Sequence, residues 1–287
     1  MSTAGPPQGA QHRSAQREGN PAGMGDPVVL LDRPAPHVAR LLINRPDKRN
    51  AIDHDVRQAL VEAIDALAGD GSVRALVFGG SAGTFSAGGD VPSMVGLDEA
   101  GARARMVHIA GLCRRVAALP IPVVSAVEGF GAGAAVGLAL LGDHIVVGPG
   151  TRILFPFLKL GLVPDWGQLL TLPRRVGIGT ARRILTAGAP VPGDEALRIG
   201  LADALVPDAE VMAHAVAHAG QLALLPQGAF GRMKRRLNEP SASLDDELAR
   251  EADDQAQGLT SREFREGYAA FRDKRPADFI RMPGADA

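Results

Sequence analysis

A single cysteine, Cys113, is all that the 287-residue chain offers for disulfide chemistry, so an internal disulfide is excluded and a reducing, cytoplasmic compartment is expected. Aromatic residues are also scarce, at 4% of the chain, whereas glycine is abundant at 35 residues, so close backbone packing is expected. No apolar run reaches the length of about 18 residues that a membrane-spanning helix needs, so no membrane segment is expected. The formal net charge of −1 argues against nucleic acid or an anionic membrane surface as the main partner.

The composition changes twice along the chain. Residues 1–25 are rich in Gly, Pro, Gln, Ser and Arg with almost no large apolar side chain, which predicts a disordered tail and does not fit a secretory signal. Residues 26–206 alternate strand and helix patterns, which predicts an α/β core. Residues 207–287 are mostly helical in pattern and predict a C-terminal helical domain. Its apolar faces, for example at Leu244 and Leu248, are too large for a short appendage to bury alone, so oligomerisation is expected.

Local patterns predict the elements of the core. The segments VVLLD and VARLLIN predict two short strands that start the core as a hairpin. Asp53 is expected to cap a helix that reaches about Ala68. Further strands are expected over 73–80, 123–127, 144–148 and 152–157, and further helices over 99–118, 134–141 and 174–187.

The stretch Pro120–Leu141 carries the strongest functional signal. A short β-branched strand leads into Gly129, Gly131 and Gly133, and small aliphatic residues then predict a helix. A helix that begins directly after a glycine loop presents unpaired backbone N–H groups and the positive end of its dipole, which together favour a negative group. That group is either a phosphate or a reacting oxygen.

As a phosphate site, this stretch matches a dinucleotide fingerprint loosely, in the form Gly129-x-Gly131-x-x-Ala134. The acidic residue expected about 20 positions further along, at the end of the next strand, is missing. Asp143 comes too early and precedes its strand. A dinucleotide-dependent oxidoreductase therefore stays open as an alternative that lacks its nucleotide-binding acid.

Eight motifs occur in an order that resembles the crotonase superfamily, the enoyl-CoA hydratase/isomerase group. They are NRPDKRNA (44–51), FSAGGD (85–90), PIPVVSAVEGFGAGAAVGLAL (120–140), LGLVPDWG (160–167), LPRRVG (172–177), LTAG (185–188), EALRIGLAD (195–203) and AFRDKRP (270–276). The resemblance spans about residues 28–287. It implies a spiral of ββα units with a C-terminal helical domain, assembled as a homotrimer or hexamer. It also implies an acyl-CoA thioester substrate, with no cofactor beyond the CoA moiety of that substrate.

The resemblance further implies an oxyanion hole built from two backbone N–H groups, which fall on Gly89 and Ala134 in this chain. The physical reason is that a thioester enolate concentrates negative charge on one oxygen, and two aimed donors stabilise that charge more than they stabilise the neutral carbonyl. The family more often has glycine at position 134. Alanine keeps the N–H, so the hole can be retained.

The resemblance places the two glutamates of the hydratase pattern at positions 137 and 157, where this chain has Gly137 and Phe157. Neither side chain can transfer a proton, which counts against simple hydration. Asp165 remains where isomerase branches of the family use an aspartate as a proton shuttle. A dehalogenase branch uses an aspartate there as a nucleophile instead. A purely structural alternative is that Asp165 caps the following helix.

The resemblance also assigns residues to the CoA path. The loop holding Lys48 and Arg49 lies near the CoA nucleotide in the family, and a C-terminal segment lies beside CoA, sometimes across a subunit boundary. The positions that follow from this are Lys48, Arg49, Ala51, Ala87, Asp90, Val91, Phe271 and Lys274. No metal is expected, because the i, i+4 pair His214 and His218 lacks the glutamate of a metalloprotease motif.

The favoured hypothesis is an acyl-CoA enzyme that stabilises a thioester enolate and moves a double bond with Asp165 as the proton shuttle. The alternatives are a hydratase or another crotonase reaction, including the aspartate-nucleophile chemistry, a catalytically silent CoA-binding protein, and the oxidoreductase described above.

Overall fold

The computed structural model describes residues 26–282, and the tail expected over residues 1–25 lies outside them. The strands are β1 (Val29–Ala35), β2 (Val38–Ile43), β3 (Ala75–Gly80), β4 (Val123–Val127), β5 (Phe130–Ala132), β6 (His144–Val147), β7 (Arg152–Leu154), β8 (Val191–Pro192) and β9 (Ala204–Leu205). The α-helices are α1 (His54–Ala68), α2 (Glu99–Ala118), α3 (Ala134–Leu140), α4 (Gln168–Val176), α5 (Ile178–Ala187), α6 (Gly193–Arg198), α7 (Val211–Leu222), α8 (Gln227–Asn238), α9 (Leu244–Thr260) and α10 (Arg262–Arg272).

Two sheets organise the core. The larger sheet has the order β1-β2-β3-β4-β6-β9, with β1 antiparallel to β2 and every later neighbour parallel. The smaller sheet has the order β5-β7-β8. Strands that alternate with helices and pair in parallel make the α/β core that the sequence predicts.

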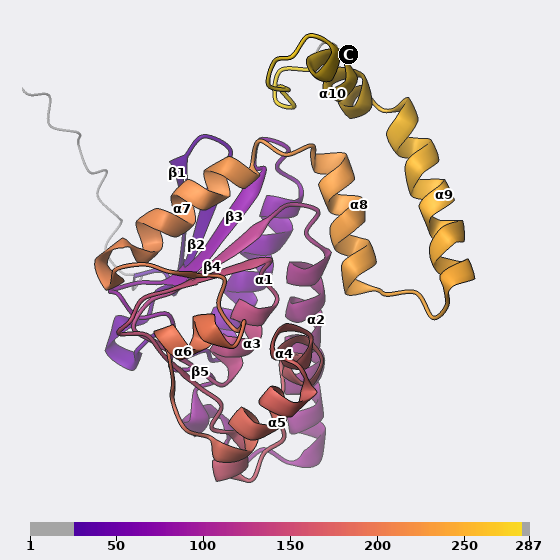
Figure 1. Ribbon diagram of the computed structural model, residues 1–287. Helices are drawn as coiled ribbons and strands as arrows, with labels where there is room; N and C mark the ends of the chain where they lie inside the picture. The colour runs from indigo at the N-terminus through magenta and orange to yellow at the C-terminus, as the bar shows by residue number, and fades with distance from the viewer. Residues whose placement is uncertain (1–25, 283–287) are drawn as a thin grey trace, which may run out of the picture.

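The larger sheet is covered on both faces, which explains why β3 is buried along its whole length. Leu76 and Phe78 of β3 pack with the apolar residues of α1 and α2. Ala75 and Val77 point to the other face and pack under α7. Figure 1 shows α7 crossing one face of the strands while α1 and α2 lie on the other.

Local signals set several element boundaries. Asp53 caps α1 as expected, because its side chain accepts a hydrogen bond from the Val56 N–H at 3.0 Å. The helix expected over 174–187 is instead two helices, α4 and α5, which meet at Gly177 with a φ of 76°. Phe130–Ala132 was expected as loop but forms strand β5, since it pairs with β7 in the smaller sheet.

The C-terminal helices leave the core. Figure 1 shows α9 and α10 standing away from the sheet, beyond α8. No residue of α9 is buried, and α10 buries only Ala270. The carboxylate of Glu263 on α10 accepts from the Gly228 and Ala229 N–H groups at the start of α8. Within residues 26–282, no helix combines the length and apolarity needed to cross a membrane.

Candidate active site

Two glycine-bearing loops lie side by side at the ends of neighbouring strands. The loop 86–90 follows β3, and the loop 128–133 follows β4. They are joined by hydrogen bonds from Ser86 N–H to Phe130 O at 3.0 Å and from Ala132 N–H to Ser86 O at 3.1 Å. Gly88 has a φ of 90°, and a β carbon there would overlap the Ala132 carbonyl and lie 3.5 Å from Ala134 N. The close approach of the two loops therefore requires glycine at position 88.

The two amides expected to form the oxyanion hole are placed on these adjoining loops. Ala134 is the first residue of α3, so its N–H has no partner within the helix. Among residues 26–282, neither the Gly89 nor the Ala134 N–H donates a hydrogen bond to another protein group. Two free donors on neighbouring loops are what stabilisation of one developing oxyanion requires.

Asn50 and Ser86 fix the shape of the first loop, and the sequence patterns did not single out either residue. Both are fully buried. The Asn50 side chain accepts from Arg45 N–H and donates to Ser81 O and Thr84 O at 2.7–2.9 Å. Ser86 Oγ donates to Asn50 O at 2.7 Å and accepts from Gly88 N–H at 3.0 Å. The serine hydroxyl thus holds the turn that presents Gly89.

The same loop is joined to the segment expected along the CoA path. Ala87 N–H donates to Arg49 O at 2.8 Å, Ile52 N–H donates to Gly88 O at 2.7 Å, and Asp90 N–H donates to Ile52 O at 3.0 Å. These bonds bring six of the residues assigned to CoA onto two adjoining segments. The six are Lys48, Arg49, Ala51, Ala87, Asp90 and Val91.

The structure does not bring the other two CoA-assigned residues to these segments. Phe271 lies on α10 and is 81% exposed, and Lys274 follows that helix. Figure 1 shows α10 apart from the core of its own chain. Their contact with CoA stays a prediction and would need a neighbouring subunit.

Asp165 lies in the loop that precedes α4 and is tied to the second glycine loop by Gln168. The fully buried Gln168 amide donates to Asp165 O at 3.0 Å and to Gly133 O at 3.1 Å. Gly133 immediately precedes Ala134, so this amide sets the Asp165 backbone relative to the N–H expected to be the second oxyanion donor. The alternative of Asp165 as a helix cap is wrong, since Gly167 is the N-cap of α4 and no side chain caps it.

The Asp165 carboxyl sits in a desolvated setting. Its Oδ1 atom is buried without a hydrogen-bond partner among residues 26–282. Burial raises the pKa of Asp165 to about 6, although the charge of Arg105 opposes the shift. Of the apolar residues in the segment before α4, Phe155, Phe157 and Trp166 are buried, whereas Val163 is 70% exposed. A carboxyl with this pKa can both accept and return a proton near neutral pH.

The charge of Asp165 affects the pKa of Cys113 on α2. Burial raises the pKa of the Cys113 thiol to about 12, and the Asp165 charge adds to the shift. A thiol with so high a pKa is not a nucleophile. Cys113 is therefore part of the surroundings of Asp165 and not a reactive group.

Trp166 occupies the space beside Gly137, the position of one hydratase glutamate by resemblance. A β carbon on Gly137 would overlap Trp166 Cβ, and it would lie 3.1 Å from Trp166 O. Trp166 is buried and has a φ of 53°, so its backbone is held in an unusual conformation there. No acidic side chain can be accommodated at position 137 with this arrangement.

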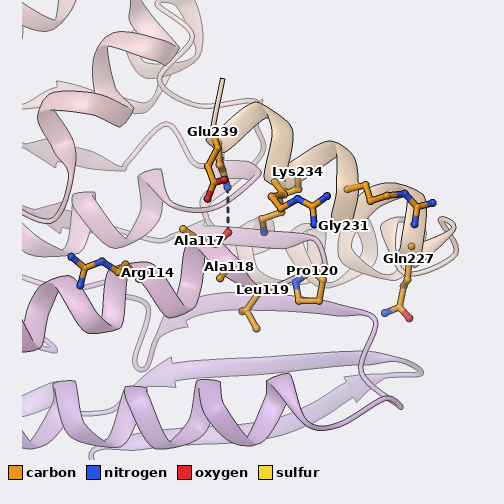
Figure 2. A pocket seen from close by; sticks show the side chains of 13 residues that line it. Arg114, Ala117, Ala118, Leu119, Pro120, Gln227, Gly231, Lys234 and Glu239 are labelled. Carbon is orange, nitrogen blue, oxygen red and sulfur yellow. Dashed lines mark hydrogen bonds between the residues drawn. The ribbon is translucent and has the colours of Figure 1, made fainter. Parts of the chain in front are cut away.

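A separate cavity of about 580 Å³ lies between the end of α2 and α8. Figure 2 shows its lining, with Arg114 and Leu119 on one side and Gln227 and Lys234 on the other. It contains neither Asp165 nor the two amides, so it is not part of the candidate active site. The residues 26–282 hold no group of three or more His, Cys, Asp or Glu side chains arranged for a metal.

Comparisons with known proteins show the family and the fold of this chain. The family model described as "Enoyl-CoA hydratase/isomerase" matches residues 35–281. The crotonyl-CoA hydratase of Syntrophomonas wolfei is 32% identical, over 85% of this chain and 94% of its own length. The 1,2-epoxyphenylacetyl-CoA isomerase of Escherichia coli is 32% identical, over 84% and 94%. An enoyl-CoA hydratase structure from Polaromonas superposes with a TM-score of 0.82 at 26% identity, over 87% of this chain and 98% of the other.

Proposed function

The chain belongs to the enoyl-CoA hydratase/isomerase family, and on that basis we propose that it moves a carbon–carbon double bond in an enoyl-CoA thioester, with Asp165 as the proton shuttle. The family has the crotonase fold, which the sequence motifs predicted and which the present α/β core with its C-terminal helices has. Relatives named as hydratases and relatives named as isomerases are equally similar to this chain, so the choice of reaction rests on the site.

One observation carries the proposal. The half-buried Asp165 carboxyl has an unpartnered oxygen and a pKa of about 6, and Gln168 ties its loop to Gly133, the residue before the Ala134 N–H. A carboxyl of this pKa is mostly ionised at pH 7 and can remove a proton. Its conjugate acid is strong enough to give the proton back.

The reaction balances without any other reactant. The Asp165 carboxylate removes a proton from C2 of a 3-enoyl-CoA, and the electron pair moves into the thioester, whose oxygen becomes negative. The Gly89 and Ala134 N–H groups stabilise that oxygen. The protonated Asp165 then delivers the same proton to C4, the double bond lies between C2 and C3, and the carboxylate is regenerated.

Hydration of an enoyl-CoA would need more acid–base groups than this site has. Addition of water requires groups that orient and deprotonate the water and a group that protonates the α carbon. Positions 137 and 157 hold Gly and Phe, and the first is blocked by Trp166. Asp165 alone serves a proton transfer between two carbons better than it serves the addition of water.

The test compares two substrates and two variants. Wild type should convert 3-enoyl-CoA to 2-enoyl-CoA far faster than it hydrates 2-enoyl-CoA, with both products separated by chromatography. Asp165→Asn should lower isomerisation by at least about a hundredfold, the lower range for general acid–base catalysis. Asp194→Asn, an exposed carboxyl on α6, is the matched control and should keep full turnover. Rapid hydration by wild type, or full isomerisation by Asp165→Asn, would contradict the assignment.

Binding separates the remaining alternatives. Acyl-CoA should raise the melting temperature of wild type and of Asp165→Asn, because a ligand that binds only the folded state stabilises it by mass action. NAD should leave it unchanged, and stabilisation by NAD without any effect of CoA esters would favour the oxidoreductase. Binding of CoA esters without turnover of any would favour a silent binding protein.

A further inference from the structure

A second cavity, of about 320 Å³, lies against the start of α1 and the first half of α2. Its polar lining consists of His54, Arg57, Ser93, Arg105 and His108, and none of its lining side chains is acidic. In volume it corresponds to roughly ten water molecules at about 30 Å³ each. A short carbon chain with a polar end group fits a space of that size.

Arg57 is the unusual member of this lining. It is only 3% exposed, and its Nε and Nη1 atoms are buried with no hydrogen-bond partner among residues 26–282. A buried guanidinium is ordinarily paired, because its desolvation is expensive. The carboxylate of Asp53, which caps the same helix, is already engaged with Arg45 at 2.7 Å and with the Val56 N–H.

The surroundings of Arg57 add positive charge instead of neutralising it. Burial and then the charge of Arg105 lower the pKa of Arg57 to about 10, and Asp53 and Asp55 only partly oppose this. Burial, followed by the charges of Arg57, His54 and Arg115, also lowers the pKa of His108. The cavity is therefore a place where an anion would relieve an unfavourable concentration of cations.

Arg105 connects the cavity to the candidate active site. A β carbon on Gly89 would lie 3.5 Å from Arg105 Nη2 and 2.6 Å from Met94 Cε. The Arg105 charge also acts on Asp165. The Arg105 side chain therefore lines the cavity, lies near Gly89 and acts on Asp165 through its charge. Asp165 is proposed to act on the carbons of the acyl group, so this link through Arg105 favours the acyl side of the thioester as the place of the cavity.

We propose that this cavity binds a carboxylate at the far end of the acyl group through Arg57 and Arg105, so that the substrate is a CoA thioester of a dicarboxylic acid. The proposal rests on the proposed function for the position of the thioester. The thioester carbonyl lies at Gly89 and Ala134, the reacting carbons face Asp165, and the distal carboxylate completes the hydrogen bonds that Arg57 lacks. Charge-assisted bonds of this kind are stronger than neutral ones and select for the anion.

The test measures binding of saturated esters, which have no double bond to move, so it does not depend on turnover. Wild type should bind hexanedioyl-CoA at least about tenfold more tightly than hexanoyl-CoA, an effect within reach of one charge-assisted bond. In Arg57→Gln and in Arg105→Gln the ratio of the two Kd values should fall to about one. Arg103→Gln, an exposed arginine on α2 that pairs with Glu99, is the control and should keep the wild-type ratio.

The other outcomes of this binding test would each contradict either the proposed cavity ligand or the proposed function. Equal binding of the two esters by wild type would overturn the proposal. If Arg57→Gln weakens free CoA and both esters by one factor, the anion is a CoA phosphate and the proposal is also wrong. Thermal melting should show that Arg57→Gln folds, since it removes a buried unpaired charge. A retained carboxylate preference in a protein that isomerises no 3-enoyl-CoA would count only against the proposed function.

Discussion

The backbone of Trp166 packs against Gly137 so closely that any β carbon at position 137 would overlap Trp166 Cβ. Trp166 is fixed in this place by its neighbours, because Gln168, two residues later, bonds both to Asp165 O and to Gly133 O. Trp166, the residue after Asp165, thus fills the space at position 137, where the resemblance places a hydratase glutamate. The absence of an acid at position 137 and the position of Asp165 belong to one local arrangement.

The first prediction concerns this contact. Gly137→Ala should destabilise the protein by about 1–3 kcal/mol, the usual cost of overpacking a filled site, and Gly137→Glu should not create hydratase activity. Gly179→Ala on α5 is the control, because a β carbon there meets nothing within 4 Å. Denaturant melts and a 2-enoyl-CoA hydration assay measure both effects. A stable Gly137→Glu protein that hydrates 2-enoyl-CoA would refute the prediction.

The second prediction concerns the pH dependence of turnover. Burial raises the pKa of Asp165 to about 6, and the base must be ionised to remove the C2 proton. The value of kcat/KM for 3-enoyl-CoA should therefore rise about tenfold per pH unit well below pH 6 and level off above it. A pH series with wild type checks this, and a profile that is flat between pH 5 and about 7 would remove Asp165 as the base.

The third prediction concerns stability. Asp165 has a folded-state pKa above its ordinary value of 3.8, so the folded chain holds this proton more tightly than the unfolded chain. Its ionisation therefore lowers stability as pH rises from about 4 to 6, and the loss persists at higher pH. Asp165→Asn should be more stable than wild type at pH 7.5, by at most about 3 kcal/mol, and the gain should shrink below pH 5. Urea melts at the two pH values measure it, and a variant less stable at pH 7.5 would contradict it.

The fourth prediction concerns Ser86. Ser86→Ala leaves the Gly88 N–H and the Asn50 carbonyl without their bonds to the hydroxyl, so the turn that presents Gly89 loses its support. Isomerase kcat should fall roughly tenfold or more, short of the hundredfold expected for complete loss of an oxyanion donor. Ser125→Ala is the control, because this buried hydroxyl bonds to Ala139 O and not to either loop. Equal kcat losses in the two variants would argue against a positioning role.

The fifth prediction concerns assembly. Leu248 and Leu259 on α9 are more than half exposed, on a helix that buries no residue within its own chain. Light scattering at micromolar concentration should give three or six chain masses, and Leu248→Glu combined with Leu259→Glu should shift the protein toward monomer. Gln257→Glu, an exposed position on the same helix, should leave the mass unchanged. A wild-type monomer at this concentration would contradict the expected trimer or hexamer.

Local sequence patterns were sufficient to predict the helices and strands whose boundaries depend on neighbouring residues in the chain. Asp53 caps α1 as its position predicted, and the continuous apolar run at β3 reflects a strand covered on both faces. They were insufficient where a distant partner decides the conformation. The glycine-rich segment Phe130–Ala132 becomes a strand because Arg152–Leu154 is available to pair with it, which no local propensity reveals.

The same limit applies to the candidate site. Gly89, Ala134 and Asp165 lie in motifs that resemble the family's, so the sequence could propose them as site residues. Asn50 and Gln168 were not proposed, because their side chains bond to groups far along the chain, Thr84 for Asn50 and Gly133 for Gln168. A buried arginine without a partner cannot be distinguished in sequence from an arginine on a solvated helix face, because the distinction depends on where α2 lies.

The strand order of the larger sheet also governs the time course of folding. Each parallel neighbour joins segments separated by a crossover, and the β6–β9 edge brings together Ile145 and Asp203, which are 58 residues apart. The entropy of loop closure must be lost before the contacts between such distant strands form, so refolding should be slow for a chain of this size. Gly89 and Ala134 lie on loops that follow β3 and β4, so we expect them to reach their positions after these strands pair. Capacity to bind a thioester should therefore return late in refolding, after most of the helical signal has recovered.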